Sequence, residues 1–290
     1  MVTRRSFLSC AVAPAARPQL VRSQSRPAIS KAVLISMLPR ELSYADRFRL
    51  AGDVGFRSME AQTVDSLEEA QKIKDAADQA GLRIHSVMNM AHWTYPLSSP
   101  NPVDVTASIS GVAASLDQAK LWGADTVLLV PAVVRPDTTY EQAWERSQQV
   151  IRERVLPMAE EVNVTIAVEE VWNKFLLTPR DFVDYVDEFE HPLLRAYFDV
   201  GNVVHYGLPE QWIRAIGDRL VKVHLKDYSR RAGFTNLGDA GEGGVNWPAV
   251  RAALREVSYT GAATVELEPG DRAYLADISQ RVDRLLGLNA

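Results

Sequence analysis

The sequence predicts a (β/α)8 barrel of the α/β class, built as a single domain. Short apolar runs rich in β-formers alternate with helical patterns from Lys31 onward, and eight such alternations are typical of a closed parallel barrel. The length of 290 residues also suits one barrel, because this fold commonly takes about 250 residues. The structural alternative is an open, doubly wound sheet. No glycine-rich nucleotide-binding pattern follows the first strand, and the run at residues 241–244 follows a late one.

The expected elements can be placed one after another along the chain. We expect strands at residues 32–37, 57–61, 83–88, 125–130, 164–169, 194–199, 220–225 and 262–267. Between them, apolar residues recur three and four positions apart, as they do on one face of a helix. The helical segments are Ser66–Ala80, Ala107–Trp122, Glu141–Glu161, Pro179–Phe189, Pro209–Ile216, Trp247–Val257 and Leu275–Leu286.

The first 30 residues differ in composition from the rest of the chain. Arg4-Arg5 precedes a short stretch of small and apolar residues, which resembles a twin-arginine export signal. Residues 17–30 are rich in Arg, Ser, Gln and Pro and predict a disordered linker. We therefore assign a signal peptide and linker to residues 1–30 and the barrel to residues 31–290. The expected location is the periplasm, or the cytoplasm if the arginine pair is not a signal.

Charge and hydropathy limit the class of partner. The net charge of −5 argues against nonspecific nucleic-acid binding, which depends on basic surface that displaces counterions. No run approaches the roughly 18 apolar residues that a membrane span requires. The only cysteine, Cys10, lies in the predicted signal, so cysteine usage does not report the compartment. We expect a small-molecule ligand and no membrane span.

Four metal-binding side chains each end an apolar run in the second half of the chain. They are Glu169, Asp199, His224 and Glu266, and between 25 and 42 residues separate successive members. Such spacing cannot place them on one helix or hairpin, but a parallel barrel brings the ends of its strands to one rim. Three carboxylates and one imidazole suit a single divalent ion such as Mn²⁺, Mg²⁺, Co²⁺ or Zn²⁺. The sequence therefore predicts a metal site.

Several longer stretches resemble a known family. They are MNMAHWTYPLSSP (88–100), VEEVWNKFLLTP (168–179), YFDVGNVVHYG (197–207), VKVHLKDYSRR (221–231), GEGGVNWPAV (241–250) and GAATVELEPGDR (261–272). These stretches resemble the xylose-isomerase-like barrel superfamily, and within it the sugar (phosphate) isomerase/epimerase branch. That branch includes ketose 3-epimerases and hydroxypyruvate isomerases. The resemblance covers about residues 31–288 and implies a sugar substrate, and barrels of this kind often form homo-oligomers.

The resemblance also implies roles for individual residues. Ketose 3-epimerases hold a metal with a Glu, an Asp, a His and a second Glu, which match Glu169, Asp199, His224 and Glu266. Strand alternation turns Glu170 away from the ligand side. It favours Glu266 over Glu268 as the ligand only weakly, because both side chains point the same way. Family members bind substrate hydroxyls with an Arg six residues after the metal His, and here that residue is Arg230. His92 and Trp93 resemble residues that line the mouth of the pocket.

Two positions depart from the epimerase pattern. The family has a His three residues after the metal Asp, where this chain has Asn202, and a substrate-binding Glu where this chain has Phe175. Asn202 can still bind a sugar hydroxyl, but Phe175 cannot. The residues themselves add two substrate-binding candidates. Glu60 ends the second strand, and Trp172 follows the fifth. Lys226 and Asp227, next to His224, are candidates for catalysis or for support of the ligands.

These residue types support proton transfer next to a carbonyl. A divalent cation neutralises the enediolate that forms when the proton leaves, and carboxylates on opposite faces remove and return protons. We assign these catalytic roles to Glu169 and Glu266, which predicts a metal-dependent sugar isomerase or epimerase. The alternatives are a metal-dependent dehydratase or lyase acting on a cyclic polyol and a non-catalytic sugar-binding barrel. A phosphodiester hydrolase fits less well, because such enzymes need many histidines and this chain has five.

Overall fold

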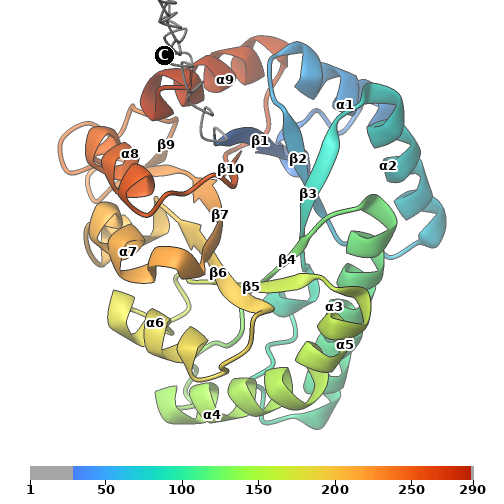
Figure 1. The fold of residues 1–290 in the computed structure, drawn as a ribbon, viewed down its shortest axis with the longest axis vertical. Helices are drawn as coiled ribbons and strands as arrows, with labels where there is room; N and C mark the ends of the chain where they lie inside the picture. The colour runs from blue at the N-terminus through green and yellow to red at the C-terminus, as the bar shows by residue number, and fades with distance from the viewer. Residues whose placement is uncertain (1–28, 289–290) are drawn as a thin grey trace, which may run out of the picture.

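Eight parallel strands close into a barrel in the computed structural model of the protein, which describes residues 29–288 (Figure 1). Around the barrel the strands follow the order β1-β10-β7-β6-β5-β4-β3-β2. The prediction of a (β/α)8 barrel is confirmed. The strands are β1 (Ser30–Leu34), β2 (Ser58–Gln62), β3 (Arg83–Met88), β4 (Thr126–Leu129), β5 (Thr165–Glu169), β6 (Leu194–Asp199), β7 (Leu220–Leu225) and β10 (Ala262–Val265).

The two ends of the strand series differ from the prediction. β1 ends at Leu34, and the next three residues form a short 3-10 helix, η1 (Ile35–Met37), instead of continuing the strand. β10 ends at Val265, two residues before the predicted end, so Glu266 directly follows the strand. β1 and β10 pair in parallel, with Val33 opposite Val265, and this pairing closes the barrel.

A ring of helices surrounds the barrel (Figure 1). One of them, α1, was not among the predicted helices; it begins after Ser43, whose side chain accepts a hydrogen bond from the backbone N–H of Asp46. The predicted helix at residues 141–161 is divided by a π-helical turn at residues 151–155. The helices are α1 (Tyr44–Asp53), α2 (Leu67–Ala80), α3 (Pro102–Trp122), α4 (Tyr140–Val150), α5 (Leu156–Val162), α6 (Pro179–Asp187), α7 (Pro209–Ile216), α8 (Trp247–Glu256) and α9 (Arg272–Leu286).

Local sequence explains where several helices begin and end. Thr139 and Gln142 form a capping box at the start of α4, in which each side chain bonds the other's backbone N–H. At its other end, α2 stops at Gly81, whose φ of 62° lies in the left-handed region that glycine tolerates best. Such caps satisfy backbone groups that the helix leaves free.

The interior of the barrel contains a buried polar layer as well as apolar side chains. His85, Ser86, Tyr197 and Thr264 are all buried. His85 Nε2 lies 2.9 Å from Thr264 Oγ1, whereas its Nδ1 is buried without a hydrogen-bond partner. The layer lies below the strand ends, and Tyr197 links it through Glu60 to His224 of the candidate site.

A small hairpin projects beyond the end of β7. Its antiparallel strands are β8 (Asp227–Ser229) and β9 (Gly233–Thr235), and neither was predicted. Asp227 is buried and fixes the loop that follows: its two carboxylate oxygens accept hydrogen bonds from the backbone of residues 228, 238 and 245 and from the indole of Trp247.

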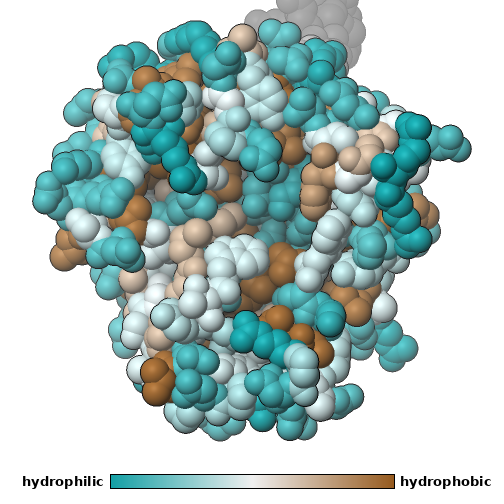
Figure 2. Space-filling model, turned by 180° about the vertical axis from the view of Figure 1, so that it is seen from behind, coloured by the Kyte–Doolittle hydropathy of each residue, from teal (hydrophilic) through white to brown (hydrophobic). Residues whose placement is uncertain are grey.

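The two faces of the barrel are distinct. The strands follow one another clockwise in Figure 1, which for right-handed crossovers places their amino ends toward the viewer. Figure 2 therefore shows the face where the strands end, with a hollow near its centre. The predicted signal and most of the linker, residues 1–28, lie outside the described residues, whereas Ser30 already pairs with Ala262 in β1. Within residues 29–288, no helix has the length and apolar character needed to span a membrane.

Candidate metal and sugar site

The four predicted metal ligands meet at the ends of four neighbouring strands. Glu169 ends β5, Asp199 ends β6, His224 lies in β7 and Glu266 follows β10, and these strands are adjacent in the barrel. One ligand atom from each side chain lies within 4.8 Å of the others. A cluster this tight allows one ion to be bound by all four residues.

His224 is held in place by carboxylates on both ring nitrogens. Its Nδ1 lies 2.8 Å from Glu169 Oε1 and 2.9 Å from Glu266 Oε2, and therefore faces the cluster. Its Nε2 lies 2.8 Å from Glu60 Oε2, on the opposite side of the ring. Metal-binding histidines commonly bond a carboxylate through the nitrogen that does not bind the metal, because this fixes the ring. His224 has that arrangement, and its Nδ1 is directed toward the cluster, where it can act as the ligand.

Asp199 has one oxygen tied to backbone and one directed to the cluster. Its Oδ1 accepts hydrogen bonds of 2.8 Å from the backbone N–H groups of Gly201 and Asn202. Its Oδ2 is buried, makes no hydrogen bond, and lies 3.9 Å from His224 Nδ1 and 3.2 Å from the ammonium of Lys226. A buried carboxylate oxygen needs positive charge beside it, and a bound cation would add to the charge that Lys226 supplies.

Lys226 adds a positive charge beside this cluster. Its Nζ lies 2.9 Å from Glu266 Oε2 and 3.2 Å from Asp199 Oδ2. Three ligand carboxylates (−3) and one ammonium (+1) leave a formal charge of −2 when His224 is neutral, which one divalent cation would balance. The donor set of three carboxylates and one imidazole fits Mg²⁺, Mn²⁺, Co²⁺ or Zn²⁺.

The two glutamates of the cluster differ in protonation. Burial raises the pKa of Glu169 to about 7. Burial acts in the same direction on Glu266, but the nearby His224 and Lys226 more than offset it and hold the pKa of that carboxyl well below its usual range. Environments that push the pKa values of two carboxyls apart are typical of acid–base pairs.

Glu170 turns away from the cluster. Its Oε1 accepts a hydrogen bond of 3.1 Å from the backbone N–H of Asp199, so it supports the neighbouring strand end. Burial, together with the nearby charges of Glu169 and Asp199, raises the pKa of Glu170 well above its usual range.

His92 is a buried hydrogen-bond donor near the cluster. Its Nδ1 accepts a hydrogen bond from the backbone N–H of Val130 at 3.1 Å, which leaves the proton on Nε2. Nε2 is buried and has no partner. Burial lowers the pKa of His92 to about 3, so the ring is neutral at ordinary pH. Trp93 packs edge-on against this ring and is 48% exposed. The role of both residues in substrate binding stays a prediction.

Trp172 belongs to a group of aromatic side chains at the mouth of the barrel, which we term the aromatic rim: Trp172, His205, Tyr228 and Phe234. Ring centroids of Trp172 lie 5.0 to 5.2 Å from those of the other three. Its indole N–H donates to the backbone carbonyl of Asn202 at 2.9 Å. This contact positions Trp172 beside the cluster, where the sequence predicted a substrate-binding residue.

Two other predicted substrate-binding residues make structural contacts. The amide nitrogen of Asn202 donates to the backbone carbonyl of Glu170 at 3.2 Å, so it links the ends of β5 and β6. Arg230 is exposed, and its guanidinium donates to the backbone carbonyl of His205 at 3.0 Å. Arg230 therefore lies at the aromatic rim, and no ion pair joins it to the carboxylates of the cluster within the described part of the chain.

Glu60 occupies a different place from the predicted one. Its side chain is fully buried beneath His224 and also accepts a hydrogen bond from the hydroxyl of Tyr197. The predicted contact with substrate does not fit this position, because His224 and Tyr197 lie around the carboxylate. The contact of Glu60 with His224 could not be expected from sequence, since β2 and β7 are not neighbours in the barrel. Phe175 is likewise remote from the cluster, packed on Tyr140, Trp144 and Tyr185.

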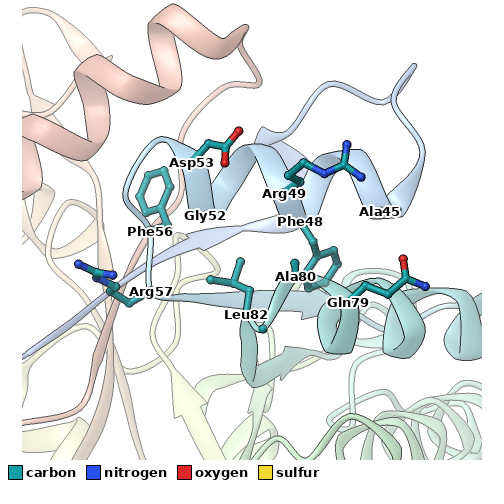
Figure 3. A pocket seen from close by; sticks show the side chains of 11 residues that line it. Ala45, Phe48, Arg49, Gly52, Asp53, Phe56, Arg57, Gln79, Ala80 and Leu82 are labelled. Atoms are coloured by element: carbon teal, nitrogen blue, oxygen red, sulfur yellow. The ribbon is translucent and has the colours of Figure 1, made fainter.

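A cavity of about 590 Å³ opens beside Glu266 and Lys226. We call it the side cavity; its wall is formed by residues 234–236 and 266–268 together with Lys226, Asp239 and Tyr274. A second depression, of about 440 Å³, lies between α1 and α2 and is lined by Arg57 and Leu82, which precede β2 and β3 (Figure 3). It is thus at the amino ends of the strands, away from the four-residue cluster.

Several known proteins that resemble this chain are sugar epimerases. An L-ribulose-5-phosphate 3-epimerase of Escherichia coli O1:K1 is 25% identical over 244 residues, which cover 79% of this chain and 84% of that protein. Among solved structures, D-allulose 3-epimerase from Methylomonas sp. has a TM-score of 0.73 at 17% identity, covering 89% of this chain and 97% of the other. The 3-keto-D-glucoside 4-epimerase of E. coli has a TM-score of 0.72 at 15% identity, covering 89% and 98%. Residues 48–282 match the family described as Xylose isomerase-like TIM barrel, and the chain belongs to that family.

Proposed function

We propose that this protein is a divalent-metal-dependent epimerase or isomerase of a keto sugar. It would remove a proton from a carbon next to the carbonyl and return one. The observation that carries this proposal is the placement of Glu169 and Glu266. Glu169 ends β5 and Glu266 follows β10, and β6 and β7 lie between these strands. Both carboxylates lie within 3 Å of His224 Nδ1, at 2.8 and 2.9 Å. The homologues that are sugar epimerases support the same reaction class.

The residues around the cluster suit this reaction. A bound divalent cation would supply Lewis-acid stabilisation of the negative charge that develops on the carbonyl oxygen. Glu266, kept ionised beside Lys226, is suited to remove the proton, and Glu169, at the end of β5, is placed to return one. The neutral His92 can donate a hydrogen bond from Nε2 to a sugar oxygen. Trp93 and Trp172 would shield the reacting carbon from solvent water.

Deuterium exchange tests the proposal whatever sugar the reaction produces. Metal-loaded protein is incubated in D₂O with a panel of ketoses, their phosphates and inososes, and deuterium uptake is followed by mass spectrometry. Exchange next to the carbonyl is the expected result. Loss of water from an inosose would instead indicate the dehydratase alternative, and binding without exchange would indicate a sugar-binding barrel.

The variants Glu169→Gln and Glu266→Gln assign the roles within the reaction. Each keeps the size of the side chain but removes a proton acceptor, so turnover should fall by about 10²–10⁴. In an epimerase, one variant can still exchange a proton on the face served by the remaining Glu while failing to invert the carbon. If both variants turned over at near wild-type rates with metal bound, neither glutamate would be the base.

A further inference from the structure

The side cavity continues directly from the metal cluster. Glu266 belongs to the cluster and also lines the cavity, and so does Lys226, which contacts it. A volume of about 590 Å³ lies within the range of small-molecule pockets. A sugar whose carbonyl end sits at the cluster could therefore extend its other end into this space.

The charge of the wall disfavours an anion. Glu266, Glu268 and Asp239 contribute −3, Lys226 contributes +1, and Arg281, which pairs with Asp239 at 2.6 Å, contributes +1, which gives a formal charge of −1. Adding Glu169 and Asp199 (−2) and a divalent cation (+2) leaves this sum unchanged. Within residues 29–288, Lys226 is the only positively charged residue that lines the cavity, and it is already paired with Glu266 and Asp199. A phosphate group entering here would meet like charge.

One side of the cavity presents an aromatic surface. Phe234, at the centre of β9, is 48% exposed and stacks on Trp172, with ring centroids 5.0 Å apart and planes at 27°. Trp172 is itself 44% exposed. The C–H face of a pyranose ring packs well on such a surface, because aromatic faces carry partial negative charge and are apolar. The wall also includes Glu268, Asn236 and Tyr274, whose polar side chains can bond hydroxyl groups.

We propose that the side cavity binds an uncharged sugar residue attached to the keto sugar, so that the substrate is a keto sugar glycoside without a phosphate group. This rests on the proposed function, which places the keto end at the metal cluster. The ring of Phe234, supported by Trp172 stacked on it, holds the face of the added ring. The acidic wall accepts hydrogen bonds from its hydroxyls and excludes a phosphate.

D-Fructose and two of its derivatives, which differ only in the substituent at carbon 6, provide the test. D-Fructose carries a free hydroxyl there, D-fructose 6-phosphate carries a phosphate, and isomaltulose carries a glucose ring. Binding to the Mn²⁺-loaded protein is measured by tryptophan fluorescence and calorimetry, which require no turnover, and deuterium exchange is measured in parallel. We expect isomaltulose to bind most tightly and the phosphate at least about tenfold more weakly than isomaltulose, because of like-charge repulsion.

Variants separate the two parts of the site. Phe234→Ala should weaken isomaltulose about two- to tenfold and leave D-fructose nearly unchanged, and Phe234→Tyr should restore binding. Glu268→Lys should reduce the discrimination against D-fructose 6-phosphate, whereas Glu145→Lys, an equal charge change on the exposed surface of α4, should not. Equal or tighter binding of the phosphate by the wild-type protein, or isomaltulose binding that is insensitive to Phe234→Ala, would overturn the inference. Failure of the proposed function would appear differently, as isomaltulose binding without exchange of any of the three sugars.

Discussion

At the scale of single residues, the ring of His224 connects the cluster to the interior of the barrel. One nitrogen faces the candidate ligands and the other faces Glu60, which in turn holds the hydroxyl of Tyr197. A metal ligand that is oriented by a buried carboxylate loses little conformational freedom when it binds an ion. The role of Glu60 is thus to position His224 and keep it basic.

Replacing Glu60 should therefore act on metal affinity. Glu60→Leu removes the acceptor for Nε2–H and should weaken Mn²⁺ binding about 10–100-fold, the effect typical of lost partners behind metal ligands. Glu60→Gln retains one oxygen as acceptor and should weaken Mn²⁺ binding less. Calorimetric titration with Mn²⁺ measures both. An unchanged metal affinity combined with a raised KM for sugar would instead support the direct substrate contact that the sequence predicted.

His92 gives a prediction about acid stability. The unfolded chain takes up a proton at an ordinary histidine pKa of 6.5, whereas folded His92 remains neutral down to about pH 3. The unfolded state therefore binds more protons between these values, and His92 lowers the free energy of unfolding as pH falls, by up to about 1.4 kcal/mol per pH unit. His92→Asn removes this contribution and should make metal-free protein less sensitive to acid. The measurement is the urea midpoint of unfolding at pH 7 and pH 5 for the wild type and His92→Asn. An equal fall of the midpoint in both proteins would contradict the low pKa of His92.

Sequence reasoning worked for residues whose role is set by their place on a strand. Glu169 and Asp199 end apolar runs, and the barrel brings all strand ends to one rim. It did not anticipate that Glu60 contacts His224, because the partner of a side chain inside a barrel depends on registers that no local pattern encodes. The contact of Lys226 with Asp199 and Glu266 was equally out of reach, since it lies beyond the regular part of β7.

At the scale of elements, the same reasoning placed strands well but missed the two shortest ones. β8 and β9 have three residues each, too few for a recognisable alternation. α1 was missed because only Phe48, Leu50 and Ala51 of its ten residues are buried, which leaves a weak apolar pattern. The missed hairpin is functionally important in the proposal, because it carries Phe234 to the side cavity.

Asp227 is expected to hold this hairpin and the loop after it. Asp227→Ala would leave four donors without their acceptor, three from backbone N–H groups and one from Trp247. Each unsatisfied buried donor costs about 1–3 kcal/mol, and loop relaxation recovers part of this, so we expect a loss of roughly 3 kcal/mol. Calorimetric melting measures the loss, and faster hydrogen exchange in residues 236–247 locates it.

A matched control for this prediction is Asp227→Asn. The amide keeps one carbonyl oxygen as acceptor, so its melting temperature should lie between those of wild type and Asp227→Ala. An Asp227→Ala protein with wild-type stability and unchanged exchange in the loop would show that the carboxylate does not organise this region.

At the scale of the whole molecule, the barrel defines a body that should be independent of the predicted export segment. The first strand begins at Ser30 and closes on β10, so removal of residues 1–28 leaves every barrel pairing in place. We expect the melting temperature to be unchanged and the proposed activity to be retained. Replacing Arg4 and Arg5 with lysine should keep the protein in the cytoplasm when cell fractions are compared. Normal export of that variant would falsify the twin-arginine prediction.

The stability of the whole barrel should depend jointly on metal and pH. In the metal-free protein, burial would lower the pKa of His224, but the charges of its neighbours more than offset this and raise it. These neighbours are Tyr197 and the carboxylates of Glu60, Glu266 and Glu169. Burial raises the pKa of Glu169 to about 7. Both groups must lose a proton to bind a cation, so binding should release protons. Metal affinity should therefore rise as pH increases toward and through pH 7.

This linkage predicts how melting responds to chelation. An ion that binds only the folded state raises its stability in proportion to the logarithm of metal concentration over Kd. The difference in melting temperature between Mn²⁺-loaded and EDTA-treated protein should therefore be larger at pH 8 than at pH 5.5. Asp199→Asn, which removes the charge of one ligand, should reduce the difference at both values. Calorimetry in buffers of different ionisation enthalpy would count the released protons. If chelation left the melting temperature unchanged at both pH values, the four side chains would hold no ion. The carboxylates of the cluster would then be balanced by Lys226 and His224 alone.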